Sequence, residues 1–374
     1  KVFASIEMRH ENSLSPIGLL RHWSFKHQIN TRTLSYTLNS IQTSFGRGFN
    51  LDQARVGLYM EMVERFSSFA SLNFNQIMDL RGPDQVYLGS YSELKNKGFS
   101  CLNPNELSLD FKYQDEVLHW MPGEKVVQPG KTEEILVPVQ LVYLFTNLDE
   151  IDLFDGPGST GLAAGATVSQ AKLAGLLEVL ERDSEALGFY EPQKCFRLTA
   201  EEGTPLASLL NKLAQHEIYV TFRDLTNELG IPCFKAFVQT LDGRQIVKGT
   251  GADLNGQKAI VSALTEVPYP FPHGPKTKPW PKNLTTKSLR DLPNYCLGNV
   301  EANLYQLESL LTKNNYSPIY VHLTRKDLDL PVIRAIIPGL ELLPDFDDTT
   351  RVKARVWEKY LTISNSEMEE IRQG

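Results

Sequence analysis

GLAAGATVSQAKLAGLLEVLERDS, residues 161–184, is the stretch of this chain that says most about its fold. It opens with glycines, which let a backbone adopt positive φ and approach a ligand closely. The residues after them have the apolar spacing of a helix, which we expect over 168–187. In that helix Glu178 and Glu181 are three residues apart, so they project from one face, and Arg182 follows directly. The stretch therefore combines a glycine turn with a helix that carries paired carboxylates.

A second copy of this unit lies earlier in the chain. GFNLDQARVGLYMEMVER, residues 48–65, aligns without a gap with GATVSQAKLAGLLEVLER, residues 165–182. Glycine turns precede both helices, GRG at 46–48 and GSTGLAAG at 158–165. The positions that coincide are Gly48 with Gly165, Gln53 with Gln170, Ala54 with Ala171, Glu61 with Glu178, Glu64 with Glu181, and Arg65 with Arg182. Self-similarity of this kind predicts an internal structural repeat.

The repeat also predicts a site for a metal and for phosphate. Two such helices facing each other would gather four carboxylates, those of Glu61, Glu64, Glu178 and Glu181. Carboxylate oxygens suit Mg²⁺, which is usually held by one or two of them together with substrate phosphates. The guanidinium groups of Arg65 and Arg182 have the geometry to bind phosphate oxygens in pairs. The alternative is two solvated helix faces, because Glu-x-x-Glu-Arg consists of good helix formers.

A third and degenerate copy is visible at residues 249–266, GTGADLNGQKAIVSALTE. Ala259 precedes Glu266 by the same interval that separates Ala54 from Glu61. The second glutamate and the arginine are missing from this copy. A plain amphipathic helix explains the segment about as well as a repeat does.

Together these segments resemble the YcaO family. The signature of that family is a glycine-rich turn and a helix that ends in Glu-x-x-Glu-Arg-Asp, as residues 161–184 do. GRGFNLDQARVGLYMEMVER resembles the first ATP-binding segment of the family, and KGTGADLNGQKAIVSALTE resembles its third segment. VIRAIIPGLE, residues 332–341, resembles its late strand and Pro-Gly turn. The resemblance covers most of the chain from about residue 46 to 341, and the combination of segments is specific.

The resemblance implies an α/β ATP-binding fold distinct from P-loop and protein kinase folds. It implies that the four repeat glutamates hold Mg²⁺ ions that bridge the ATP phosphates. It places residues near the nucleotide and its phosphates, namely Arg65, Arg182, Ser159, Gly161 and Arg47. The implied reaction is attack of a peptide carbonyl oxygen on the γ-phosphate, after which a nucleophile replaces that oxygen. A Cys, Ser or Thr side chain would give an azoline, sulfide a thioamide, and an amine an amidine. No residue is assigned a catalytic role.

The chain departs from the family pattern at several points. Arg47 stands where many members carry lysine, and Glu266 is followed by VPYPF without the usual Gln and Arg. The lysine and hydroxyl residue of the first segment have only Lys1 and Ser13 as candidates. The sequence given ends in EEIRQG, whereas azoline-forming members often end in a proline-rich tail that enters the active site.

Apolar periodicity predicts a mixed α/β or α+β class, with strands and helices interleaved along one YcaO-like domain over 1–374. The expected strands cover 34–38, 135–145, 218–223, 233–238, 319–322 and 332–337. The expected helices cover 51–71, 168–187, 205–215, 256–266, 300–313 and 351–360. Residues 268–282, PYPFPHGPKTKPWPK, hold too many prolines for regular structure. They read as an exposed loop or as a flap near a ligand.

Composition limits the kinds of partner. The chain has 374 residues, 41% hydrophobic, and a net charge of −7 with no long basic stripe, so we expect no nucleic-acid partner. No apolar run is long enough to span a bilayer, and we expect a cytoplasmic protein without a membrane partner. The four cysteines are scattered and have no metal-like spacing, so we expect reduced structural thiols.

The sequence thus predicts an ATP- and Mg²⁺-dependent enzyme that activates a backbone amide in a peptide or protein as a post-translational modification. Thioamide formation is favoured over cyclodehydration to an azoline, because the chain lacks a visible proline-rich tail and peptide-docking domain. A TfuA-like or other protein that delivers the substrate or the sulfur is an expected partner. The alternative function is a non-catalytic nucleotide-binding accessory or scaffold protein, which the missing Gln and Arg after Glu266 suggest.

Overall fold

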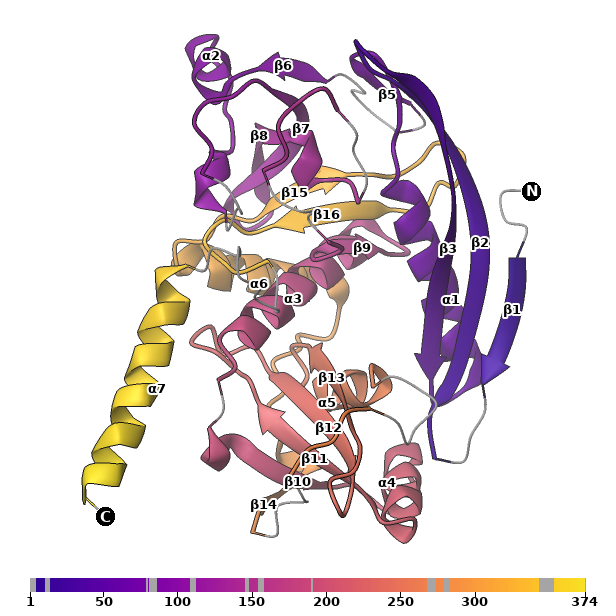
Figure 1. Cartoon of the computed structure of the whole chain (residues 1–374), viewed down its shortest axis with the longest axis vertical. Coiled ribbons are helices and arrows are strands. Elements are labelled where there is room, and N and C mark those ends of the chain that lie inside the picture. The colour runs from indigo at the N-terminus through magenta and orange to yellow at the C-terminus, as the bar shows by residue number, and fades with distance from the viewer. Residues whose placement is uncertain are drawn as a thin grey trace.

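The computed structural model describes residues 5–10, 14–78, 80, 86–107, 112–144, 148–153, 158–189, 191–267, 274–278, 283–342 and 353–373. Within these ranges the chain forms three sheets, with helices packed against them and between them (Figure 1). The mixed α/β class predicted from the sequence is confirmed. In the part of the chain that the structure describes, no helix has the length and apolar character needed to cross a membrane.

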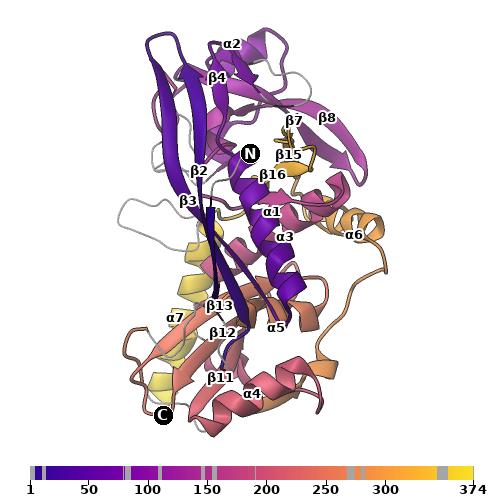
Figure 2. The same ribbon diagram turned by 90° about the vertical axis from the view of Figure 1, so that its right-hand side faces the viewer.

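The first sheet is built on a long antiparallel hairpin of β2, Ile17–Asn30, and β3, Ser35–Gly48, which runs along one side of the molecule (Figure 2). Helix α1, Leu51–Ser67, follows β3 directly and packs against both strands. Alternate side chains of β2 form the core under α1, including Leu19, Trp23 and Phe25. The shorter strands of this sheet are β1 Ser5–His10, β4 Ser71–Asn73 and β5 Gln76–Met78.

The second sheet has the order β6-β7-β15-β16-β9, and β8 also pairs with β7. Helix α3, Val168–Ala186, packs on β16 and β9, and helix α6, Val300–Lys313, packs on α3 and β7. The largest hydrophobic core of the described residues lies around this sheet. Its strands are β6 Tyr87–Gly89, β7 Leu118–Gln128, β8 Lys131–Pro138, β9 Leu162–Ala164, β15 Ile319–His322 and β16 Val332–Ile336.

The third sheet has the order β13-β12-β11-β10-β14. Helix α4, Pro205–Gln215, packs on β11, and helix α5, Gly256–Thr265, packs on β12 and β13. These helices and the sheet share a separate core. The strands are β10 Cys195–Thr199, β11 Ile218–Asp224, β12 Cys233–Thr240, β13 Ile246–Ala252 and β14 Thr285–Ser288.

The repeated sequence unit corresponds to a strand, a turn and a helix, and it occurs as β3–α1, β9–α3 and β13–α5. Each helix begins at a side-chain cap that accepts a backbone N–H, which stabilises the first turn. The caps are Asn50, Thr167 and Asn255. The buried alanine of each copy has no exposed surface, at Ala54, Ala171 and Ala259. The degenerate third copy therefore has the same local structure as the other two.

The coinciding glutamines of the repeat also have a structural role. Gln53 Oε1 accepts a hydrogen bond from the N–H of Phe49 at 3.1 Å. Gln170 Oε1 accepts one from the N–H of Ala166 at 3.0 Å. Both side chains thus satisfy backbone donors just before a helix, in the manner of a capping box. These glutamines hold the turns in place and need no ligand to explain them.

Several predicted boundaries are wrong. The helix expected over 51–71 ends at Ser67, because Ser68 donates from its N–H and its hydroxyl to carbonyls of the last turn. The strand expected over 135–145 ends at Pro138, where a 3-10 turn begins. The strand expected over 34–38 is only the start of β3, and β2 was not predicted. The C-terminal helix α7 covers Ala354–Gln373 instead of 351–360, and residues 351 and 352 lie outside the described ranges.

Only residues 274–278 of the proline-rich segment 268–282 belong to the described ranges, and they form no helix or strand. They are hydrogen-bonded to the chain around the β12–β13 turn. The N–H of Thr277 donates to the carbonyl of Gly243 at 2.8 Å, and the N–H of Ile246 donates to that of Pro275 at 3.2 Å. This part of the segment is therefore an exposed stretch held beside the β12–β13 turn. Lys1 and Ser13, the candidates for the family's lysine and hydroxyl residue, lie outside the described residues.

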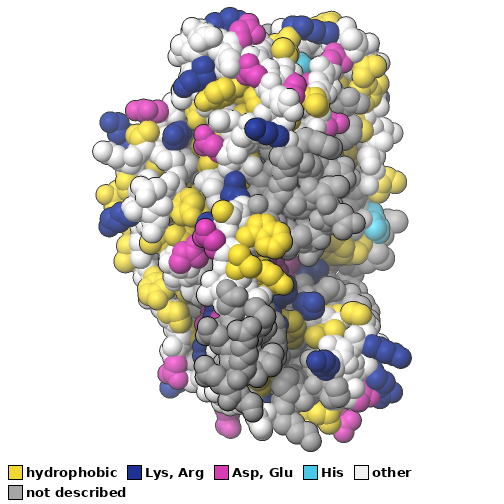
Figure 3. Space-filling model, turned by 60° about the vertical axis from the view of Figure 1, so that its left-hand side comes forward, with side chains coloured by type: hydrophobic (Ala, Val, Ile, Leu, Met, Phe, Trp, Pro, Cys, Tyr) yellow, Lys and Arg dark blue, Asp and Glu magenta, His cyan; other side chains and the backbone are white. Residues whose placement is uncertain are grey.

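Helix α7 projects from the body of the molecule at the C-terminal end (Figure 1). It is tied to the end of α3 by Arg355, whose two guanidinium nitrogens donate to both carboxylate oxygens of Asp183 at 2.7 and 3.0 Å. On the face shown in Figure 3, Lys and Arg side chains are scattered among acidic, polar and hydrophobic ones.

Candidate functional site

A cavity of about 680 Å³ lies where the three strand–helix units meet. Its wall is mostly polar and contains six glutamates and five basic side chains. These charged residues are Glu61, Glu64, Glu178, Glu181, Glu185 and Glu266, with Arg47, Arg65, Arg182, Lys235 and Lys248. The predicted carboxylates and arginines of both repeat copies are thus brought together in one place.

Helix α3 contributes one face of the cavity. Arg182 lies among the glutamates of its own helix, with Nη1 at 3.6 Å from Glu181 Oε1 and at 2.8 Å from Glu185 Oε2. Its Nη2 is 3.9 Å from Glu178 Oε1. The spacing of these four residues is that of consecutive turns on one side of a helix, so all four face the same space.

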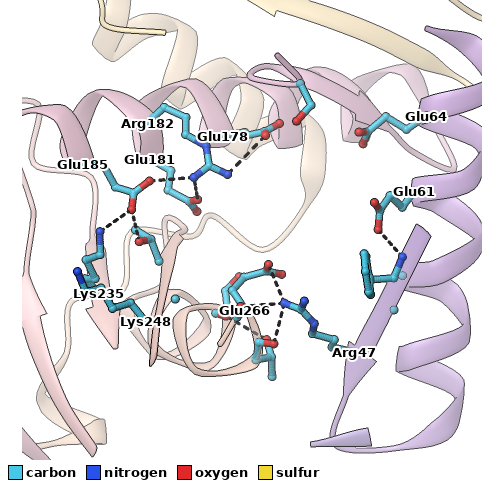
Figure 4. A pocket seen from close by; sticks show the side chains of 18 of the residues that line it. Arg47, Glu61, Glu64, Glu178, Glu181, Arg182, Glu185, Lys235, Lys248 and Glu266 are labelled. Atoms are coloured by element: carbon cyan, nitrogen blue, oxygen red, sulfur yellow. Dashed lines mark hydrogen bonds and ion pairs between the residues drawn. The ribbon is translucent and has the colours of Figure 1, made fainter. Parts of the chain in front are cut away.

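Helix α1 contributes a similar face. Arg65 Nε lies 3.7 Å from Glu61 Oε1 and 3.8 Å from Glu64 Oε1. Glu61 Oε2 also accepts a hydrogen bond from the N–H of Phe45 in β3 at 2.9 Å. Figure 4 shows that Glu61 and Glu64 on one side and the glutamates of α3 on the other point into a shared space. The internal repeat therefore places two equivalent carboxylate pairs around one cavity.

The carboxylates of the two pairs are largely shielded from water. Burial raises the pKa of Glu181 to about 8. It also raises the pKa of Glu61 and Glu178, and it raises that of Glu64 well above the usual range. A carboxylate that loses hydration without gaining enough positive charge binds its proton more tightly. Arg65 and Arg182 thus offset only part of the cost of burying these four groups, and a divalent cation would add the positive charge that they need.

Sequence reasoning missed Glu185 and the two lysines. Burial would raise the pKa of Glu185, but Lys235, Thr250 and Arg182 outweigh it and hold that pKa below its ordinary value. Lys235 Nζ lies 3.0 Å from Glu185 Oε1. Glu185 follows Glu181 by one helical turn, so the helical spacing could have identified it. Lys235 and Lys248 lie on β12 and β13, and no sequence pattern linked them to the repeat.

Arg334 is a further residue that sequence reasoning left without a role. It lies on β16 in the late segment of the family resemblance and is only 2% exposed. Burial lowers its pKa to about 10, and the negative charges of Glu178 and Glu64 act in the opposite direction. Its Nη1 donates to the carbonyl of Gly158 at 2.9 Å. Arg334 thus places a buried positive charge behind the glutamates of both helices.

The third unit brings Glu266 to the cavity, where Arg47 binds it. Arg47 Nη1 lies 3.2 Å from Glu266 Oε2 and 2.8 Å from the backbone carbonyl of the same residue. Figure 4 shows Arg47 and Glu266 across the cavity from α3, with Lys235 and Lys248 at one end. Basic side chains from other elements therefore line the cavity, although Gln and Arg do not follow Glu266 in the sequence.

The two turn residues predicted to lie beside the nucleotide have different positions. Ser159 lines the cavity. Gly161 is not among the lining residues, but its N–H donates to Glu178 Oε2 at 3.2 Å. Its φ is +81°, and a Cβ atom there would lie 2.1 Å from the carbonyl oxygen of Ala335. Gly161 therefore positions a carboxylate of the site from behind.

The donors of the cavity fit Mg²⁺ with a nucleotide better than they fit a metal held by protein alone. Among the described residues, no group of three or more His, Cys, Asp or Glu side chains lies close enough together to hold a metal ion without further ligands. Mg²⁺ is normally bound by one or two carboxylates, water and substrate phosphates. Paired carboxylates with arginines beside them match that type of site, and the cavity has the volume of a small-molecule site.

Comparison with known proteins identifies the family. The model of the family described as "YcaO cyclodehydratase, ATP- and Mg²⁺-binding" matches residues 45–268, more than half of the chain. A protein of Methanothermobacter thermautotrophicus is 27% identical over 352 residues, which cover 83% of this chain and 84% of the relative. A protein encoded in the tfuA 3′ region of Rhizobium leguminosarum bv. trifolii is 25% identical over 252 residues, covering 63% of this chain and 56% of the relative.

Two solved structures have the same fold. YcaO from Methanopyrus kandleri, bound with AMPPCP and Mg²⁺, has a TM-score of 0.61 and 21% identity, covering 90% of this chain and 86% of its own. A heterocyclase in complex with substrate and cofactor has a TM-score of 0.69 and 18% identity. That comparison covers 90% of this chain, which spans 50% of the heterocyclase.

Proposed function

Because the chain belongs to the YcaO family of ATP- and Mg²⁺-dependent enzymes that activate peptide amides, we propose that it phosphorylates a backbone amide oxygen of a peptide or protein substrate. The amide oxygen bonds to the terminal phosphorus of ATP as ADP leaves. A nucleophile then adds to the amide carbon, and the carbon–oxygen bond breaks as phosphate departs. One observation carries the proposal: α1 and α3 present equivalent Glu-x-x-Glu-Arg faces to one cavity.

The residues of the cavity have distinct roles in this proposal. Glu61, Glu64, Glu178 and Glu181 would hold Mg²⁺, which when bound neutralises phosphate charge. Arg65 and Arg182 are held among these carboxylates and so are aimed at the space that phosphates would occupy. Arg47 and Ser159 line the same space. Charge stabilisation and positioning are the main needs of phosphoryl transfer, and these side chains supply both.

Gly161 and Arg334 act on the site through Glu178. The N–H of Gly161 fixes one carboxylate oxygen, and the buried charge of Arg334 favours the ionised form. A carboxylate that is fixed before the ligand arrives loses less entropy on binding and keeps its geometry during the reaction. Both residues are positioning residues in this account.

The product that we propose is a thioamide, formed with sulfide or with sulfur from a partner protein. The similarity to a protein encoded in the tfuA 3′ region supports a TfuA-like partner. The heterocyclase similarity supports a peptide substrate, and it keeps azoline formation as the competing outcome. We place the enzyme in the cytoplasm, in keeping with four free cysteines in the described residues.

A non-catalytic accessory role is the second candidate, because Glu266 lacks the Gln and Arg that usually follow it. The cavity argues for catalysis, since Arg47 contacts Glu266 and two lysines face the same space from β12 and β13. Turnover distinguishes the two functions, because an accessory protein would bind nucleotide without forming product.

The test follows the amide oxygen. Peptides that bind the protein are synthesised with heavy oxygen in their backbone carbonyls and incubated with ATP, Mg²⁺, sulfide and the protein. We expect ADP, heavy oxygen in inorganic phosphate, and peptides in which sulfur has replaced oxygen. Loss of water without sulfur incorporation would indicate azoline formation instead. ADP formation with unlabelled phosphate would show hydrolysis by water and would refute amide activation, and nucleotide binding without turnover would support the accessory role.

A further inference from the structure

We propose that the free edge of β3 binds the substrate peptide as an added antiparallel or parallel strand and leads it into the cavity. The inference rests on the proposed function, since it names where that enzyme holds its peptide. β3 pairs with β2 along its whole length, from Ser35 to Gly48. Among the described residues, no other strand pairs with β3, so its second edge is unoccupied by the rest of the sheet.

The hydrogen-bond pattern shows which backbone groups face that edge. In an antiparallel pair, alternate residues direct both N–H and C=O away from the partner strand. Thr31 and Leu34 lie opposite each other where the turn meets the strands, and the Thr31 N–H donates to the Leu34 carbonyl at 2.8 Å. Every second residue from Leu34 onward, which means the even-numbered residues of β3, therefore bonds to β2. Phe45 N–H donates outward to Glu61, as this alternation requires for odd-numbered residues. The backbone groups directed to the free edge therefore belong to Ser35, Thr37, Asn39, Ile41 and Thr43.

This edge lacks the features that usually protect an exposed strand. Natural proteins guard edges with charged residues, proline or a covering segment, because an open edge recruits other chains. Residues 34–45, LSYTLNSIQTSF, contain no charged residue and no proline. Ile41 is 73% exposed, which is unusual for a large apolar side chain on a strand. An unguarded edge with an exposed apolar side chain fits a partner that adds a strand.

The edge ends at the cavity. Phe45, Gly46 and Arg47 of β3 line the cavity, and Glu61 accepts a hydrogen bond from the outward N–H of Phe45. A peptide paired with residues 35–43 could not continue its pairing at Phe45, because the N–H of Phe45 already donates to Glu61, a glutamate of the proposed Mg²⁺ site. Each extended residue advances the chain by about 3.3 Å, so the next amide groups of the peptide would lie in the cavity. Backbone pairing also suits an enzyme whose target is itself a backbone amide.

The occupant that we assign is an extended peptide, and the competing occupant is the same edge of a second copy of this chain. The two differ in stoichiometry. A peptide leaves the protein monomeric through this edge, whereas edge-to-edge pairing of β3 would give a dimer that disappears when the edge is blocked.

The probe is a displayed library of random linear peptides, selected on the wild type with Mg²⁺ and a non-hydrolysable ATP analogue. The enriched peptides are then measured against Ile41→Pro and Ile41→Thr. Proline removes the outward N–H but no bond to β2, so the fold tolerates it at an edge. Threonine keeps the N–H and the strand preference. We expect Ile41→Pro to weaken peptide binding by about tenfold or more, Ile41→Thr to weaken it much less, and both to bind nucleotide as the wild type does.

A second measurement uses the wild type alone and so does not depend on a variant that folds. The enriched peptides are N-methylated at alternate amides in two complementary sets. A peptide paired with β3 loses binding when the set facing β3 is methylated and keeps it when the set facing solvent is methylated. Equal effects of the two sets, or peptides indifferent to Ile41→Pro, would overturn the proposal. So would a wild-type dimer that becomes monomeric in Ile41→Pro. Failure of the proposed function would appear separately, as a wild type that binds no nucleotide.

Discussion

At the scale of single residues, the site depends on how its carboxylates are held. Glu178 has its place because Gly161 donates to it from a backbone conformation that only glycine adopts easily. Glu61 has its place because it caps the edge of β3 at Phe45. In each repeat copy, a backbone N–H from the segment before the helix therefore holds a carboxylate of that helix. In the first copy the donor is Phe45 of β3, and in the second it is Gly161 of the glycine-rich turn.

Gly161→Ala tests this support, and Gly203→Ala is its matched control because φ is +81° at both positions. At Gly203 a Cβ atom meets nothing within 4 Å, so we expect a loss in the free energy of unfolding of about 1 kcal/mol. At Gly161 the Cβ atom would collide with the carbonyl of Ala335, so we expect a larger loss and weaker Mg²⁺-dependent nucleotide binding. Chemical denaturation and calorimetry measure the two effects. Equal losses for both variants would contradict this role of Gly161.

At the scale of elements, α3 is held at both of its ends by charged contacts outside the cavity. Near its start, Lys172 Nζ lies 2.8 Å from Glu124 Oε2 on β7. His322 on β15 lies 3.3 Å from the other oxygen of that carboxylate. At its end, Asp183 is fully buried and binds Arg355 of α7 and the N–H of Glu341. The Asp of the Glu-Arg-Asp motif thus fastens the C-terminal helix to the helix that carries the site.

Glu124→Gln tests the first contact through its pH dependence. The His322 imidazole, whose Nε2 lies 3.3 Å from Glu124 Oε1, and the nearby Lys172 hold the pKa of Glu124 down to about 2. A carboxyl whose pKa is lowered on folding adds stability above its unfolded pKa of about 4.5, and this stability is lost as the pH falls through the folded pKa. We expect the variant to be less stable than the wild type at pH 7 and the difference to vanish near pH 2. Denaturation across this range checks it, and a difference that persists at the lowest pH would count against the ion pair.

Arg355→Ala tests the second contact. It leaves the carboxylate of Asp183 buried without its cation, and breaking a buried pair from one side costs about 3–5 kcal/mol. Arg290→Ala is the control, because Arg290 pairs with Glu201 at an exposed site where water and salt screen the ion pair and its loss changes stability little. Urea denaturation of both variants gives the comparison. Losses of similar size would mean that α7 is not fastened to α3 in the way described.

At the scale of the whole molecule, three strand–helix units come from distant parts of the chain and meet near its middle (Figure 1). Residues of all three line one cavity. The sequence predicted the repeat, the class and the glutamates of α1 and α3, because helix periodicity and carboxylate spacing are local signals. Lys235, Lys248 and Arg334 could not be predicted in this way. They reach the cavity through the packing of β12, β13 and β16, which depends on contacts far apart in the sequence.

The β2–β3 hairpin also shows how far strands could be predicted from the sequence. β2 has buried side chains at alternate positions, so its alternation was a usable signal that the strand prediction overlooked. The outward positions of β3 are mostly polar and uncharged, and its turn at Arg32 and Thr33 contains no glycine. Its full length therefore becomes evident only from pairing with β2, and with it the free edge proposed as the peptide site.

The central claim is that α1 and α3 together form one Mg²⁺-dependent nucleotide site. Calorimetric binding of a non-hydrolysable ATP analogue, with and without Mg²⁺, tests it in the wild type, Glu61→Gln, Glu178→Gln and the exposed control Glu133→Gln. We predict that Mg²⁺ strengthens binding to the wild type and the control, and that each variant of the site weakens the Mg²⁺-dependent affinity by about tenfold or more. Binding that needs Glu178 and not Glu61, or that ignores both, would contradict the claim.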